Sequence, residues 1–187
     1  TTLNLIRKYL KAGVMEKGLE KATITGVPQG GPLSVVCSNI YLDKLDKELE
    51  QRGLRFTRYA DDVLIFTKSE MAANRVMKSI CSWLERKLFL KVNATKTKVV
   101  RPTRSKYLGF TFLKNGSEWK VGPTNEKKKK LKKKLSEYLK RGKAVARPLA
   151  VTIKRVNEIV RGWINYFRIG MMKLFMEEFG EWLRHKI

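Results

Sequence analysis

Two short apolar runs enclose a pair of adjacent carboxylates in residues 54–66, which read LRFTRYADDVLIF. Residues 54–56 and 63–66 have the composition of β-strands, so the residues between them predict a hairpin turn. That turn would carry Asp61 and Asp62 at its tip. Adjacent like charges are costly unless water or a cation neutralises them, and hard carboxylate oxygens favour Mg²⁺ or Mn²⁺. An ordinary acidic turn is the alternative, because aspartate is common in turns.

The composition favours a polyanionic partner. The chain has 187 residues and a formal net charge of +24, from 41 Lys and Arg against 17 Asp and Glu. A hydrophobic content of 43% is enough to bury a core, which excludes a disordered basic tail. A charge this high opposes compaction unless a polyanion such as nucleic acid neutralises it. In so basic a chain, two acidic residues at one rigid turn favour a metal site over an ordinary turn.

The sequence favours neither a membrane partner nor bound zinc. All apolar runs are much shorter than the roughly 20 residues that span a bilayer, so we expect no membrane partner. A structural zinc site needs about four ligands in local pairs, whereas the chain holds only Cys37, Cys81 and His185. We interpret the two cysteines as free thiols and expect a reducing, cytoplasmic location.

The first part of the chain mixes helix and strand patterns. Apolar residues spaced by three and four predict a short helix that ends around Gly13 and longer helices over 33–49 and 70–88. An Asn115-Gly116 pair predicts a tight hairpin. Short strand-type runs are expected at 22–25, near Val92 and Val99, over 107–113 and over 119–121.

Beyond Gly122 and Pro123 every pattern is helical. Apolar spacing predicts three helices, marked by residues 131–139, 153–167 and 174–183. Residues 123–187 hold 18 basic against 6 acidic side chains. We therefore expect an α+β fold with two domains, 1–122 and 123–187.

Two further segments have the composition of a ligand-binding surface. Residues 26–32, GVPQGGP, predict a turn in which Gly30 and Gly31 allow close approach of the backbone to a ligand. An ordinary loop before a helix is the alternative. Residues 127–134, KKKKLKKK, crowd seven lysines into two helical turns. A phosphate backbone would relieve their mutual repulsion, whereas a solvated helix face is the alternative.

The order of these motifs resembles that of the palm of bacterial reverse transcriptases of the group II intron type. The matching segments are residues 29–34 (QGGPLS), 59–62 (YADD), 90–98 (LKVNATKTK) and 107–110 (YLGF). A further segment, residues 160–167 (VRGWINYF), resembles the thumb, or maturase-specific domain, of the same proteins. The resemblance implies a partial polymerase palm, with an antiparallel sheet and helices on one face, followed by a three-helix thumb.

The resemblance also implies a role for each matching residue. Asp61 and Asp62 would be two of three catalytic aspartates that hold two Mg²⁺ ions, one activating the primer 3′-hydroxyl and the other steadying the triphosphate. Lys96 would donate a proton to pyrophosphate. The other implied contacts are Gln29, Gly30, Gly31, Tyr59, Ala60 and Asn93 with nucleotide and template; Tyr107, Leu108, Gly109 and Phe110 as primer grip; and Lys127, Lys128, Lys130, Lys134 and Arg161 with the nucleic-acid backbone.

The implied activity is RNA-directed DNA polymerisation in a bacterial-type cytoplasm. Its partners would be an RNA template, an RNA/DNA primer duplex, dNTP and intron RNA. The alternative is an RNA-binding maturase module that assists intron splicing without polymerase activity in this fragment. A retron-like reverse transcriptase is less favoured, because the segment over 160–167 resembles the intron-type thumb.

One departure from the family concerns the third aspartate. In the family it lies on a strand upstream of the helix that we expect over 33–49. Glu16 and Glu20 stand in or beside a turn, and Asp43 and Asp46 lie on a helix whose inward face is apolar. The fingers region of the family is missing too. We therefore expect a palm–thumb fragment that cannot polymerise alone.

Overall fold

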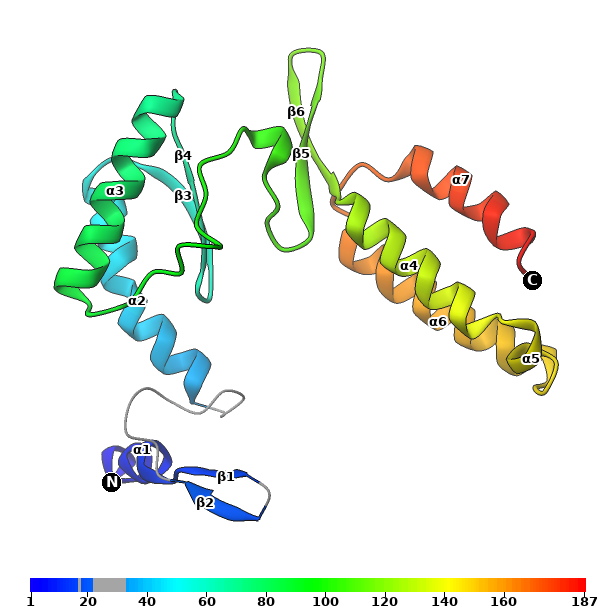
Figure 1. Cartoon of the computed structure of the whole chain (residues 1–187), viewed down its shortest axis with the longest axis horizontal. Helices are drawn as coiled ribbons and strands as arrows, with labels where there is room; N and C mark the ends of the chain where they lie inside the picture. Colours follow the sequence, from blue (N-terminus) through cyan, green and yellow to red (C-terminus); the bar gives the residue numbers. More distant parts are fainter. Residues whose placement is uncertain (17, 22–32) are drawn as a thin grey trace. The chain divides into compact units, whose positions relative to one another are not determined.

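The computed structural model describes residues 1–16, 18–21 and 33–187 (Figure 1). The chain divides into two compact units, Thr1–Val99 and Val100–Ile187. Helices and antiparallel strand pairs occur in both units, which confirms the α+β class. Among the described residues the strands form three separate two-stranded sheets. The strand predicted at 22–25 and the glycine-rich turn at 26–32 lie outside the described residues.

The first unit has its core between two helices and a hairpin. Its elements are α1 (Thr2–Lys11), β1 (Val14–Glu16), β2 (Leu19–Lys21), α2 (Ser34–Gln51), β3 (Arg55–Tyr59), β4 (Asp62–Phe66) and α3 (Glu70–Lys87). Leu45 and Leu49 of α2 pack with Ile80 and with Leu88, which directly follows α3, and all four are at most 5% exposed. Partly buried apolar residues of β3 and β4 pack against the same cluster.

Local signals explain where the two long helices of this unit begin and end. The helix α2 ends just before Gly53, whose φ of +64° is easily adopted only by glycine. The helix α3 begins after Ser69, whose Oγ accepts a hydrogen bond from the Ala72 amide at 3.2 Å. Both helices therefore agree with the sequence prediction to within a few residues.

The strands predicted near Val92 and Val99 are absent, so that prediction is wrong. Residues 88–101 contain a turn but no strand. The carboxamide oxygen of Asn93 accepts hydrogen bonds from the amides of Thr95 and Lys96, at 3.1 and 3.2 Å. Such a side-chain-to-backbone turn competes with strand formation, and it lies between the two valines.

The second unit joins a hairpin to a small helical bundle. Its elements are η1 (Pro102–Arg104), β5 (Phe110–Asn115), β6 (Glu118–Pro123), α4 (Asn125–Tyr138), α5 (Arg141–Ala144), α6 (Leu149–Phe167) and α7 (Lys173–Arg184). The bundle core is formed by Leu131, Leu135, Val156, Phe175 and Phe179. The three predicted helices are present as α4, α6 and α7, whereas the four-residue α5 was not expected.

Backbone contacts bind the hairpin to the helices. The Met171 amide donates to the Val121 carbonyl at 2.7 Å, and the Thr124 amide donates to the Gly109 carbonyl at 2.9 Å. Gly122 lies within β6, and a Cβ there would be only 3.1 Å from the Met171 carbonyl oxygen. The hairpin thus belongs to the same compact unit as α4, α6 and α7. The domain boundary after Gly122 stays a prediction.

Among the described residues, no helix combines the length and apolar character that crossing a bilayer requires.

Candidate functional site

The carboxylates predicted at a hairpin tip do lie there. Tyr59 and Asp62 form the last residue pair of β3 and β4, which leaves Ala60 and Asp61 as a two-residue turn. Asp61 and Asp62 are both exposed. Ala60 has a φ of +53°, a left-handed conformation that costs a non-glycine residue roughly 1 kcal/mol. Strained backbone of this kind clusters at functional sites.

The donor set of this tip fits magnesium. The ion prefers oxygen ligands, keeps several waters and is commonly bound through one or two carboxylates plus substrate phosphates. Two exposed aspartates on neighbouring residues meet the protein's part of that requirement. In the part of the chain that the structure describes, no group of three or more His, Cys, Asp or Glu side chains could hold a metal ion.

Sequence reasoning missed Arg58, which supports the same tip. Its guanidinium binds both carboxylate oxygens of Asp46 on α2 and also donates to the Ala60 carbonyl at 2.9 Å. Asp46 is twelve positions away on a helix, so no local pattern identifies the pair. The available signal was an arginine directly before the YADD motif, in the strand that leads to the turn.

Asn93 and Lys96 lie together in one turn after α3. The Asn93 side chain accepts hydrogen bonds from the Thr95 hydroxyl at 2.7 Å and from the Thr95 and Lys96 amides. The side-chain oxygen of Asn93 therefore shapes the turn that presents Lys96. The Lys96 side chain is exposed, as a contact with a triphosphate requires.

The predicted primer-grip residues form a second tight turn, in the other unit. Tyr107 and Phe110 exchange two backbone hydrogen bonds, at 3.0 and 2.8 Å. Leu108 and Gly109 between them have φ values of +50° and +84°, as type I′ turns require. The Leu108 carbonyl accepts a hydrogen bond from Tyr166 Oη at 2.9 Å. This turn is therefore fixed to the end of α6.

Aromatic rings surround the same turn. The Phe110 ring stacks with Tyr166 at 5.9 Å between centroids and tilts against Phe167 at 4.9 Å. Phe167 is 3% exposed, whereas Tyr166 is 54% exposed. Phe167 is therefore a core residue, whereas Tyr166 faces outward.

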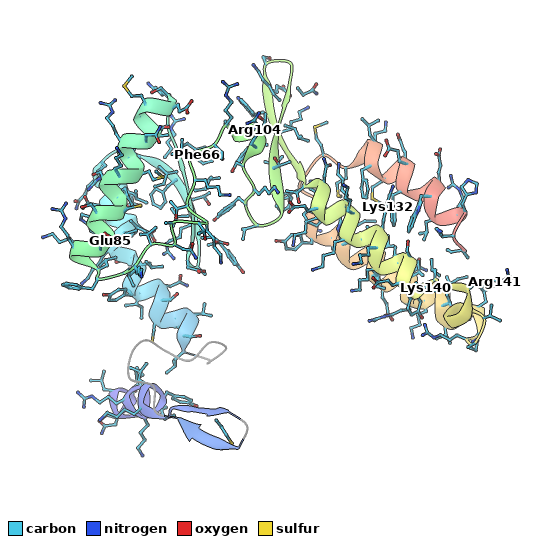
Figure 2. All side chains as sticks on the ribbon, in the orientation of Figure 1. Phe66, Glu85, Arg104, Lys132, Lys140 and Arg141 are labelled. Atoms are coloured by element: carbon cyan, nitrogen blue, oxygen red, sulfur yellow. The ribbon has the colours of Figure 1, made fainter. Side chains whose placement is uncertain are left out.

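The lysines of α4 have two different environments: some lie over aromatic rings, and others are exposed to solvent. Lys128 and Lys132 lie over the Phe175 ring, with Nζ 5.2 and 5.9 Å from its centroid, and Lys132 also lies 5.8 Å from Trp182. Figure 2 shows Lys132 on α4, on the side toward α7. Lys130 and Lys134 are exposed instead. The run thus supplies both packing and a charged surface.

Two further basic residues, Lys106 and Arg161, contribute to the charge of this unit. Lys106 binds Glu126 in the first turn of α4, and this hydrogen bond holds the pKa of Glu126 below its ordinary value. The carboxylate of Glu126 is therefore held in its ionised form by Lys106, and the two charges offset each other. Arg161 is exposed on α6. The predicted nucleotide contacts Gln29, Gly30 and Gly31 lie outside the described residues.

Family comparisons cover most of the chain. The family described as reverse transcriptase (RNA-dependent DNA polymerase) matches residues 1–112. The family described as group II intron, maturase-specific domain matches residues 128–187. The two matches leave only residues 113–127, from β5 to the start of α4, between them.

Individual relatives match shorter parts of larger proteins. Protein YkfC of Escherichia coli (strain K12) is 30% identical over 145 residues, which cover 59% of this chain and 37% of that protein. The retron Ec86 reverse transcriptase of Escherichia coli is 29% identical over 145 residues, covering 75% and 40%. The group II intron-encoded protein LtrA of Lactococcus lactis subsp. cremoris is 48% identical over 54 residues, covering 29% and 9%.

The chain thus spans at most 40% of the length of these three relatives. Its own two matches follow one another in the order that the motifs predict, with YADD in the first and the helices α6 and α7 in the second. The chain belongs to the reverse transcriptase family, and its C-terminal part, residues 128–187, matches the group II intron maturase-specific domain.

Proposed function

We propose that this chain is the palm and thumb part of an RNA-directed DNA polymerase of the group II intron type, with Asp61 and Asp62 as its metal-binding carboxylates. The observation that carries the proposal is the exposure of both side chains at the tip of one hairpin. Two exposed carboxylates on neighbouring residues of a chain of net charge +24 favour a cation site over an ordinary acidic turn.

The chain's own residues would position and neutralise the reactants. Bound Mg²⁺ would supply activation of the primer 3′-hydroxyl and stabilisation of charge on the triphosphate. Asp61 and Asp62 would hold the ions on a turn that paired strands keep rigid. Lys96, exposed after the Asn93 turn, would approach the triphosphate and donate a proton to the leaving pyrophosphate. Gln29, Gly30 and Gly31 would contact the nucleotide and template.

The second unit would hold the template–primer duplex and intron RNA. Lys130, Lys134 and Arg161 present exposed cations, and each phosphate contact releases counterions and adds to the salt dependence of binding. The turn over 107–110 would contact the primer, since its backbone conformation is fixed by Tyr166.

A second candidate is an RNA-binding maturase module that assists splicing without DNA synthesis. It is favoured by the maturase-specific match over residues 128–187, which coincides with the most basic part of the chain. The two functions use different residues, the carboxylates of the turn in one case and the cations of the helices in the other. They can therefore be separated by substitution.

The test measures DNA synthesis and RNA binding on the same variants. In the longest protein that contains this chain, Asp61→Ala with Asp62→Ala should abolish primer extension on an RNA template and leave RNA binding unchanged. Charge reversal of Lys130 and Lys134 should instead weaken RNA binding and flatten its salt dependence. Primer extension that survives the aspartate substitutions would overturn the polymerase proposal. A protein that assists splicing but extends no primer would establish the second candidate.

The isolated chain provides a separate measurement. We expect no dNTP incorporation by the 187-residue chain with Mg²⁺ alone, because two carboxylates supply only part of the family's ligand set. Robust incorporation would show that the third ligand is present in this chain after all.

A further inference from the structure

Arg58 connects the aspartate turn to the helix α2. Arg58 Nε donates to Asp46 Oδ1 at 2.7 Å, and its Nη2 donates to the other oxygen of the same carboxylate. This two-point geometry fixes the guanidinium plane as well as its position. The side chains of Arg58 and Asp46 are only 12% and 24% exposed, so water competes poorly for the pair.

Further contacts of this guanidinium reach the turn and a second residue of α2. Arg58 Nη1 donates to the carbonyl oxygen of Ala60 at 2.9 Å and to Asn39 Oδ1 at 2.9 Å. Asn39 and Asp46 both lie on α2, so the arginine is anchored to that helix at two points. Ala60 is the strained residue of the turn, with a φ of +53°. Strain of this kind persists only where surrounding contacts determine the backbone, and Arg58 supplies such a contact.

We propose that Arg58, held by Asp46, is a positioning residue that fixes the Ala60 carbonyl and thereby aims Asp61 and Asp62 at a divalent cation. The inference rests on the proposed function of those two carboxylates. It assigns no metal ligand to Asp46, because both oxygens of that carboxylate already accept hydrogen bonds from Arg58. The group acts through the backbone of the turn and not through contact with the metal.

The sign of the electrostatic effect makes this role testable. A positive charge next to a cation site opposes cation binding, so Coulomb's law alone predicts tighter Mn²⁺ binding when Arg58 is removed. If Arg58 instead acts by positioning the two carboxylates, its removal should weaken Mn²⁺ binding. Removing Arg58 and Asp46 together changes the net charge by zero, since one charge of each sign is lost. The double variant R58Q/D46N therefore isolates the geometric effect from the charge effect.

The chain offers a matched control in Arg52. This arginine also pairs with an acidic residue of α2, with Nε donating to Glu48 Oε1 at 2.7 Å. Its Nη1 donates to Ser79 Oγ on α3 at 2.7 Å. Arg52 thus connects α2 to α3, whereas Arg58 connects α2 to the turn. The double variant R52Q/E48Q removes a comparable ion pair from the same unit without touching the Ala60 carbonyl.

The experiment titrates the whole chain with Mn²⁺ alone and follows free Mn²⁺ by its paramagnetic resonance signal. We expect R58Q/D46N to weaken Mn²⁺ binding by about tenfold or more, the range seen when groups that orient metal ligands are removed. R52Q/E48Q should bind within about twofold of the parent chain. Arg58→Lys, which keeps the charge but loses the planar fork, should give a partial loss. Unfolding by guanidinium, followed by tryptophan fluorescence, reports the stability of every variant.

Each result bears on one of the two claims. Parent-like Mn²⁺ binding by R58Q/D46N, together with loss of binding in Asp61→Asn, would overturn the role of Arg58 and leave the metal site standing. Parent-like binding by Asp61→Asn itself would overturn the metal site. If R58Q/D46N fails to fold, Arg58→Lys decides: unchanged Mn²⁺ affinity in that folded variant would overturn the inference.

Discussion

Tyr166 Oη donates a hydrogen bond to the carbonyl oxygen of Leu108 at 2.9 Å, across 58 positions of sequence. The bond ties the last turn of α6 to the tight turn over 107–110. Leu108 has a φ of +50° there, so a contact on its carbonyl helps to hold a conformation that leucine rarely adopts. The turn that the family resemblance assigns to the primer and the helix that it assigns to the thumb are therefore packed within one unit.

Replacing Tyr166 by Phe should loosen this turn without dismantling it. The variant keeps the ring stacked on Phe110 but loses a hydrogen bond worth about 1 kcal/mol. We expect the amides of Tyr107 and Phe110, which bond to each other's carbonyls, to exchange with deuterium about fivefold faster, the factor that corresponds to about 1 kcal/mol. Exchange at the parent rate would show that the hydroxyl contributes nothing to the turn.

Gly109 should tolerate no side chain. Its φ is +84°, and an added Cβ would lie 2.9 Å from Lys127 Cε and 3.4 Å from Phe167 Cζ. Gly109→Ala should therefore lower the free energy of unfolding by about 1–2 kcal/mol for the left-handed backbone, with a smaller further cost for displacing the flexible Lys127 side chain.

Gly116→Ala is the control for that measurement. Gly116 also has a positive φ, +60°, but a Cβ there would have nothing within 4 Å. It should incur the backbone cost alone. Guanidinium unfolding of both variants in a Trp83→Phe background, followed by the fluorescence of the remaining tryptophans, reports on this unit. Equal losses in the two variants would mean that Gly109 is required only for its φ.

The two kinds of lysine on α4 should separate in a paired comparison. Lys128→Ala with Lys132→Ala removes two ammonium groups that lie over aromatic rings, and we expect a stability loss of about 1–2 kcal/mol at 0.5–1 kcal/mol for each interaction. Lys130→Ala with Lys134→Ala removes the same charge from exposed positions and should leave stability unchanged.

RNA binding should show a difference between the same two variants. The slope of log affinity against log salt should fall by about one to two units when Lys130 and Lys134 are removed, since two phosphate contacts are lost. Lys128 and Lys132 should contribute less, because their ammonium groups are engaged with Phe175 and Trp182. A fall in slope that is equal in both double variants would contradict this division of roles.

Cys81 should react slowly with alkylating reagents. Burial raises the pKa of its thiol, and the charge of Glu85 raises it further. A raised pKa lowers the thiolate fraction at pH 8, and the thiolate is the reactive form. We expect iodoacetamide to modify Cys81 several times faster in guanidinium than in the folded chain, as followed by peptide mass. Equal rates in the folded and unfolded chain would contradict the half-buried, neutral thiol.

The helices and hairpins could be predicted because their signals are local. Apolar residues spaced by three and four define α2, α3, α4, α6 and α7 to within a few residues, and Asn115-Gly116 marks the turn between β5 and β6. The aspartate tip was predicted from two strand-type runs, 54–56 and 63–66, that flank the two adjacent aspartates. The prediction of strands near Val92 and Val99 was wrong, because the Asn93 side chain accepts hydrogen bonds from the amides of Thr95 and Lys96 instead.

The supporting contacts of the site could not be predicted, because they join residues that are distant in sequence. Arg58 forms an ion pair with Asp46, which lies twelve positions earlier in the sequence, and Lys128 lies over the ring of Phe175 on another helix. Both depend on how α2 meets β3 and on how α4 meets α7. The lysine run by itself also does not indicate which lysines pack and which face solvent. That is decided by the bundle core, in which Leu131 and Leu135 are buried.

The most direct test of the metal site maps where a paramagnetic ion binds. Mn²⁺ added in small amounts to the isotope-labelled chain should broaden the amide signals of residues 59–63 before all others, and Asp61→Asn should abolish that selective broadening while the spectrum of the fold is kept. Broadening that spreads over other acidic residues such as Glu177 and Glu178, or that persists in Asp61→Asn, would contradict a metal site at the hairpin tip.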